Sequence, residues 1–152
     1  SSVNLNNLPA GGSFQVNINT RLTASDGKAN VFMRLNNNTG TIYDQVSSYG
    51  VNDTTAVVAA YNQNSFSLDA FPANGAAAGI SGNASIIIPN CKNTTWFKNI
   101  TAAGNHVTTG SEARSGTMQG LFRSTNAVSS IQFFLSEGNF ATGSYFAVSP
   151  AP

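Results

Sequence analysis

The sequence predicts an all-β fold, an antiparallel β-sandwich of jelly-roll-like type with about ten short strands and little or no helix. Two observations lead to this expectation. Apolar and polar residues alternate in short segments along the chain, as they do in strands that bury one face. The 14 glycines and 5 prolines fall mostly between these segments, where turns are expected. The 152 residues contain no linker-like stretch, so we expect one domain, residues 1–152.

The clearest strand is expected at residues 14–22, where apolar residues alternate with polar ones. The apolar positions that fall on one face of it are Phe14, Val16, Ile18 and Leu22. Asp26-Gly27 follows, a dipeptide favoured in two-residue hairpin turns because glycine accepts positive φ. A second alternating segment, residues 30–35, comes next. We therefore expect 14–22 and 30–35 to form a hairpin.

The same pattern predicts further strands along the rest of the chain. They are Thr41–Val46, Thr55–Tyr61, Ser65–Ala70, Ala84–Ile88, Thr95–Thr101, Thr117–Arg123, Ser129–Leu135 and Ser144–Val148. The Ala-rich stretch Ala73–Gly82 is expected to be a loop, in which Ala76–Ala78 is alternatively the start of a short helix. Pro150 and Pro152 are expected to end the last strand, because proline has no N–H to donate to a sheet.

The chain is poor in charge, which excludes several classes of partner. Charged residues make up 9% of the sequence, against about 25% in an ordinary soluble protein. The net charge is +1, and the lysines and arginines are scattered rather than clustered, so we expect no nucleic-acid partner. No apolar run approaches the roughly 20 residues of a membrane span, so no membrane partner is expected either.

The sequence offers no recognisable set of catalytic or metal-binding residues. His106 is the single histidine and lies in a polar setting, so we expect it to be an exposed structural residue. Cys91 is the single cysteine, which excludes an internal disulfide and a Cys/His zinc cluster. No serine sits in a Gly-x-Ser-x-Gly motif. We therefore expect no catalytic residue, no metal and no cofactor.

The acidic residues are equally uninformative. They are Asp26, Asp44, Asp53, Asp69, Glu112 and Glu137. Asp26, Asp53 and Glu137 sit in turn-like surroundings, whereas Asp44 and Asp69 occupy expected strands. Glycoside cleavage needs two carboxyl groups on either side of one bond, and nothing in the sequence pairs any two of these. The chain is therefore expected not to be an enzyme, and a polysaccharide depolymerase is the least favoured function.

Aromatic residues in polar surroundings are the candidates for ligand binding. Trp96 lies among asparagine and threonine, and a tryptophan in such a setting can stack on a sugar ring. Tyr43, Tyr49 and Tyr61 have similar amphipathic potential. The alternative is that they are core residues: in a strand, Trp96 and Phe97 would point to opposite faces and one of them would face the core.

Several motifs together resemble a family of bacteriophage virion-surface β-sandwich proteins. The motifs are Leu22–Gly27, Val31–Leu35, Gly40–Tyr43, Gly79–Pro89, Gly120–Arg123, Ala127–Phe133 and Gly138–Ser144. In that family such domains occur in tail fibres and tailspikes and as head decoration proteins. The resemblance covers most of the chain in the same order. It departs at Phe146–Pro152, where the family commonly closes on a Leu-Tyr-Gly strand, so the pairing of the last strand is left open.

The resemblance implies a non-enzymatic structural protein on the outer surface of a tailed phage particle. We expect a head (capsid) decoration subunit that acts as an oligomer, by resemblance a homotrimer. Its partners would then be its own copies, the major capsid protein and other virion proteins. The alternative is the receptor-binding head of a tail fibre, which would recognise a host cell-surface glycan through Trp96, Tyr43 or Tyr49. The absence of coiled-coil heptads and of a fibre shaft favours the first function.

Overall fold

In the computed structural model, which describes residues 1–23, 30–51, 53–68, 81–107 and 113–151, every regular element is a β-strand. In chain order the strands are β1 Ser2–Leu5, β2 Phe14–Thr20, β3 Val31–Leu35, β4 Tyr43–Val51, β5 Thr54–Gln63, β6 Phe66–Ser67, β7 Gly82–Ile88, β8 Lys98–Val107, β9 Ala113–Phe122, β10 Ile131–Leu135 and β11 Tyr145–Pro150.

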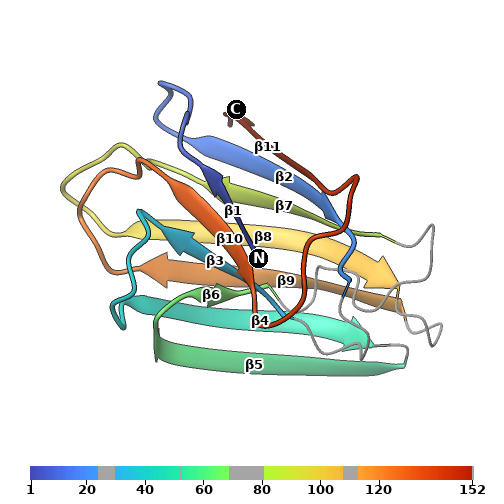
Figure 1. The fold of residues 1–152 in the computed structure, drawn as a ribbon. Helices are drawn as coiled ribbons and strands as arrows, with labels where there is room; N and C mark the ends of the chain where they lie inside the picture. The colour runs from blue at the N-terminus through green and yellow to red at the C-terminus, as the bar shows by residue number, and fades with distance from the viewer. Residues whose placement is uncertain (24–29, 52, 69–80, 108–112, 152) are drawn as a thin grey trace.

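The strands form two sheets that pack face to face (Figure 1). A four-stranded sheet has the order β1-β10-β3-β6, and a seven-stranded sheet has the order β11-β2-β7-β8-β9-β4-β5. Every strand pairing is antiparallel. The antiparallel β-sandwich expected from the sequence is confirmed.

The pairing of the strands is nested. β2 pairs with β11, β3 with β10 and β4 with β9, while β7 and β8 pair with each other inside these three pairs. The first and last thirds of the chain therefore lie side by side. The pairing of β11 with β2 also answers the question that the divergent C-terminal motif left open. Pro150 ends β11, where it is tolerated because β11 is an edge strand.

Alternate residues of both sheets fill one hydrophobic core between them. In β2 the buried positions are Phe14, Val16, Ile18 and Thr20, of which the first three are the apolar residues that the alternation predicts. The ring of Tyr43 lies in the same core, 4.9 Å from the ring of Phe66 and 5.0 Å from that of Phe122. Because Phe66 belongs to the four-stranded sheet and Tyr43 to the seven-stranded sheet, these rings join the two layers.

The predicted hairpin of 14–22 and 30–35 is wrong. β2 lies in the seven-stranded sheet and β3 in the four-stranded sheet, so the chain crosses from one layer to the other between them. Both strands still bury their apolar residues, because the two sheets face the same core. The turn residues Asp26-Gly27 and most of the expected loop Ala73–Gly82 lie outside the described residues.

Candidate functional site

The most distinctive surface is the outer face of the seven-stranded sheet, the side turned away from the core. We define the outer face as the even-numbered residues of β4, the odd-numbered residues 55–61 of β5, and the odd-numbered residues of β2, β7, β8, β9 and β11. The register places these residues in rows across the sheet: Ala59 in β5 lies beside Val46, Val46 beside Gln119, and Gln119 beside Thr101. The outer face is therefore a continuous surface across all seven strands.

The outer face is almost free of charge. Its central strands present mainly Asn, Ser, Thr, Gln and Ala, and Asp44 is its only charged side chain. Polar side chains bond to one another across strands: the amide of Gln15 donates to Ser85 Oγ (3.1 Å), and that of Asn83 donates to Asn105 Oδ1 (3.0 Å). The opposite side of the molecule differs, because there Arg34 lies over the ring of Phe134 at 4.2 Å.

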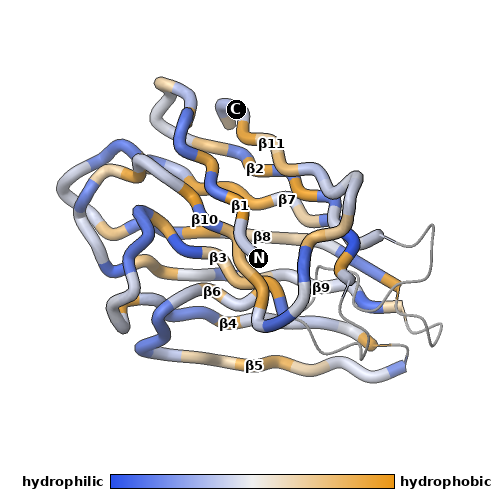
Figure 2. Tube along the Cα trace, in the orientation of Figure 1, coloured by the Kyte–Doolittle hydropathy of each residue, from blue (hydrophilic) through white to orange (hydrophobic). Residues whose placement is uncertain are grey.

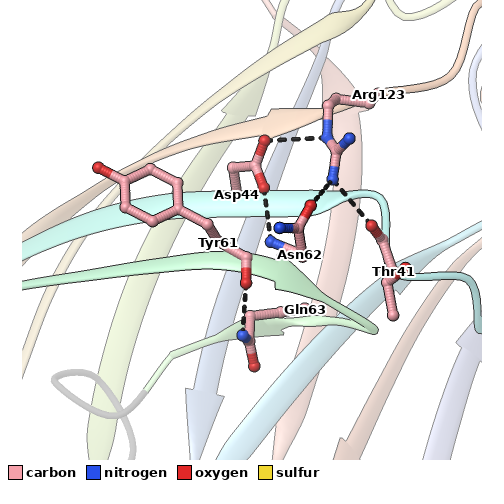
Figure 3. Close-up of polar contacts among 6 residues, drawn as sticks. All are labelled: Thr41, Asp44, Tyr61, Asn62, Gln63 and Arg123. Carbon is pink, nitrogen blue, oxygen red and sulfur yellow. Dashed lines mark hydrogen bonds and ion pairs between the residues drawn. The ribbon is translucent and has the colours of Figure 1, made fainter.

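The charge of Asp44 is compensated within the protein (Figure 3). Its Oδ2 lies 2.9 Å from Nε of Arg123, and its Oδ1 accepts a hydrogen bond of 2.8 Å from the backbone N–H of Asn62. Nη2 of Arg123 donates to the carbonyl of Thr41 (2.8 Å) and to Oδ1 of Asn62 (2.5 Å). This cluster holds the end of β5 against β4 and neutralises that corner of the outer face.

Several shallow depressions lie along the described part of the sheet. One, of about 240 Å³, is lined by Asp44, Val46, Tyr61, Gln119 and Leu121, among others. The side chain of Tyr61 is 62% exposed beside it. Another, of about 480 Å³, lies over the middle strands between Asn83 and Thr117. Both of these depressions are open to solvent.

Trp96 lies in the loop between β7 and β8 rather than in a strand. The side chain of Trp96 is 66% exposed and that of Phe97 is 49% exposed. The expectation that one of them faces the core is wrong, because it assumed a strand from Thr95, whereas β8 begins at Lys98. Oδ1 of Asn93 accepts the backbone N–H groups of Thr95 (2.7 Å) and Trp96 (2.9 Å), which gives the loop a fixed shape.

Lys98 anchors this loop from the buried side. Its side chain is buried, and Nζ donates hydrogen bonds to the carbonyls of Trp96 (2.8 Å), Thr125 (3.2 Å) and Ser124 (3.3 Å). Burial lowers the pKa of Lys98, and the nearby Cys91 acts weakly in the opposite direction. Lys98 therefore connects the loop that carries the exposed Trp96 and Phe97 to the loop between β9 and β10.

The other two aromatic candidates do not join Trp96 in one site. Tyr43 is fully buried, and its hydroxyl lies 2.9 Å from the carbonyl of Asn38 and 3.2 Å from both backbone polar atoms of Leu35. A buried ring has no face for a sugar, so Tyr43 is a core residue. Tyr49 is half-buried and packs against the core. It lies in β4, six residues and roughly 20 Å from Tyr43.

His106 is buried, so the expectation of an exposed histidine is wrong. It lies near the end of β8 and points inward like Ile100 and Ala102. The sequence contained this signal, since His106 continues the even-numbered series of inward residues in β8. Cys91 is also buried, and its Sγ lies 3.0 Å from the carbonyl of Gly12. Burial raises the pKa of this thiol, which disfavours the nucleophilic thiolate.

Acidic side chains do not gather anywhere in the described part of the chain. Asp44 is paired with Arg123, and Asp53 and Glu137 are exposed outside the strands. Residues 1–23, 30–51, 53–68, 81–107 and 113–151 contain no group of three or more His, Cys, Asp or Glu side chains that could hold a metal ion. Nor do they contain a helix long and apolar enough to cross a membrane.

Sequence reasoning noted Tyr61 but missed the outer face as a unit. Each strand showed its neutral polar residues locally, yet only the strand order reveals that they share one surface. Comparison with protein-family models, curated proteins and solved structures finds no match to this chain. The resemblance to phage virion-surface proteins therefore stays a prediction from the sequence.

Proposed function

We propose that this protein is a non-enzymatic structural subunit on the outer surface of a tailed bacteriophage particle. In this proposal it decorates the head as an oligomer, with its own copies and the major capsid protein as partners. The observation that carries the proposal is the broad, nearly charge-free outer face of the seven-stranded sheet. The virion context comes from the resemblance of the sequence motifs.

The outer face has the chemistry of a contact surface between proteins. The centres of protein interfaces are depleted in charged residues, since a buried charge without a partner is costly. A protein that covered the row of Val46, Gln119 and Thr101 would displace water from neutral side chains only. The one carboxylate, on Asp44, already has its counter-charge. Such a face can be covered without leaving an unpaired ion.

Counting the protein on purified particles of the phage that encodes it tests this proposal. Quantitative mass spectrometry against the major capsid protein should give hundreds of copies per particle. Thr101→Lys, which places a charge in the middle of the outer face, should lower that number while the fold is kept. A count in the tens or fewer contradicts a decoration role.

A second function is favoured by a different observation, the exposed Trp96–Phe97 pair. An aromatic side chain held on a fixed loop, with Asn93 and Thr95 beside it, is suited to stacking on a sugar ring. In this alternative the chain is a receptor-binding head that recognises host surface saccharide.

Glycan-array and cell-binding assays with Trp96→Ala test the second function. Because Trp96 is mostly exposed, the variant should fold like the wild type, and binding should fall at least tenfold. Tyr145→Ala removes another exposed aromatic side chain, 59% exposed at the far edge of the sheet, and serves as the matched control. Equal binding by both variants and the wild type would exclude Trp96 as a saccharide platform.

A further inference from the structure

β5 is an edge strand of the seven-stranded sheet that has little protection against pairing with another strand, and we call it the bare edge. It is ten residues long and, in the described part of the chain, pairs with β4 alone. A free edge exposes a row of backbone N–H and C=O groups that can bind another strand. Proteins normally protect such edges by making them short, or by placing charges, proline or a bulge there.

The other three edges in the described part of the sandwich follow that rule, whereas β5 follows it only at its end, where its register with β4 shifts between Ala60 and Gln63. β1 has four residues, β6 has two, and the six-residue β11 ends in Pro150. β5 reads Thr-Thr-Ala-Val-Val-Ala-Ala-Tyr-Asn-Gln, with no charge, no proline and no glycine. Val57 and Val58 in its middle are 69% and 48% exposed. Figure 2 shows β5 pale to orange along its middle and hydrophilic where it leads into β6.

The end of β5 is occupied by the protein's own side chains, which limits the bare edge to residues 54–60. The backbone N–H of Asn62 donates to Asp44, and the side-chain amide of Gln63 donates to the carbonyl of Tyr61 (2.7 Å) (Figure 3). Asn62 also has a φ of 54°, which departs from strand geometry. With its end fixed by the Arg123 cluster, β5 is an ordered template.

We propose that β5 binds β5 of a second copy in an antiparallel pair over residues 54–60, with Val57 at the two-fold axis. This pairing joins the two seven-stranded sheets into one, with both outer faces on the same side. It deepens the proposed function, on which it rests, by naming one contact of the oligomer. An isologous contact of this kind would join two protomers or two trimers.

The composition of the edge favours a second copy as the occupant. In a two-fold pair each residue meets one of the same strand, so any charge near the axis would meet its like. Residues 54–60 carry none. Ala56 would lie opposite Val58, and Thr55 opposite Ala59, so small neutral side chains meet throughout. The edge has no charged side chain that could select a partner of opposite charge.

Val57→Lys tests the pairing, with light scattering after size-exclusion chromatography as the readout. Two lysines side by side at the axis should repel, so the molar mass should fall to half that of the wild type. Asn4→Lys adds the same charge to an exposed site on β1, in the four-stranded sheet and outside the outer face, and should leave the mass unchanged. Circular dichroism should show the same fold for both variants.

Cross-linking gives an independent measurement. Val57→Cys should form covalent dimers with a short bis-maleimide reagent, whereas Asn4→Cys, exposed on the other sheet, should not. The buried Cys91 is common to both variants and controls for background. A monomeric wild type, an unchanged mass for Val57→Lys, or dissociation by Asn4→Lys alone would each overturn the edge pairing. The copy number on particles is measured separately, so a high count together with any of these results would refute the edge pairing and leave the decoration role standing.

Discussion

Tyr43 is a polar residue placed in the middle of an apolar core. Burial favours the neutral phenol and raises the pKa of Tyr43 to about 12, from an ordinary value near 10. The folded state therefore binds the phenol proton more tightly than the unfolded state does. The stability that this provides is fully present below pH 10 and is lost as the pH rises from about 10 to 12.

Tyr43→Phe should remove this part of the alkaline sensitivity. Between pH 9 and 12 the wild type should lose about 2–3 kcal/mol more unfolding free energy than the variant, since one pKa unit corresponds to about 1.4 kcal/mol. Urea unfolding followed by circular dichroism at several pH values measures this difference. Parallel curves for the two proteins over this range would show that Tyr43 does not titrate with folding.

Lys98 is a residue whose charge is solvated by the backbone instead of water. Lys98→Met keeps much of the apolar stem but leaves three carbonyls without their donor, so we expect a loss of about 1–3 kcal/mol in unfolding free energy. Lys92→Met is the matched control, because Lys92 is exposed and its Nζ donates to one carbonyl, that of Val128. The control should lose about 1 kcal/mol or less. Equal losses in urea unfolding would contradict the anchoring role.

At the scale of the elements, β9 has no room for a side chain at Gly120, because the ring of Phe66 in β6 packs against it. A Cβ atom on Gly120 would lie 2.5 Å from Cε1 of Phe66, which is part of the opposite sheet. The missing side chain lets the Phe66 ring approach the β9 backbone and lie beside Tyr43. Glycine here is therefore a packing requirement between the two layers.

Gly120→Ala should destabilise the sandwich by about 1–3 kcal/mol, because the ring or the strands must move to make room. Gly12→Ala is the control, since nothing lies within 4 Å of the Cβ it would add. Its effect should stay within about 0.5 kcal/mol. Thermal or urea unfolding measures the stability of both variants. A Gly120→Ala variant as stable as the wild type would mean that the two sheets can accommodate a methyl group at this point.

The sequence was informative about strands and less so about their partners. Alternation is a local property, so it identified Phe14, Val16 and Ile18 as inward residues of β2. Partner choice depends on the whole chain, which explains why the Asp26-Gly27 turn signal suggested a hairpin that does not exist. Trp96 was misjudged because the same alternation was extended past the start of a strand, into a loop held by Asn93.

The candidate site was harder to predict than the fold. Its residues are ordinary Ser, Thr, Asn and Gln, and none carries a chemical signature in the sequence. They become a surface only when β11, β2, β7, β8, β9, β4 and β5 are placed in order. The bare composition of Thr54–Gln63 was visible, but its position at an edge was not.

At the scale of the whole molecule, the nested pairing makes the fold depend on distant segments. β2 pairs with β11 and β3 with β10, so these contacts join segments from near the two ends of the sequence. Sandwiches dominated by such non-local pairs fold in about milliseconds to seconds. Stopped-flow refolding monitored by circular dichroism should fall in this range, and refolding in microseconds would show that the non-local pairs do not limit the folding rate.

The near absence of charge on the outer face has a consequence for the environment in which it can work. Dissolved ions screen interactions between charges, with a Debye length of about 10 Å at 0.1 M and about 3 Å at 1 M. Contacts built from neutral side chains and backbone groups do not depend on that length. Charge screening would therefore not weaken a contact made through the outer face as the salt concentration rises.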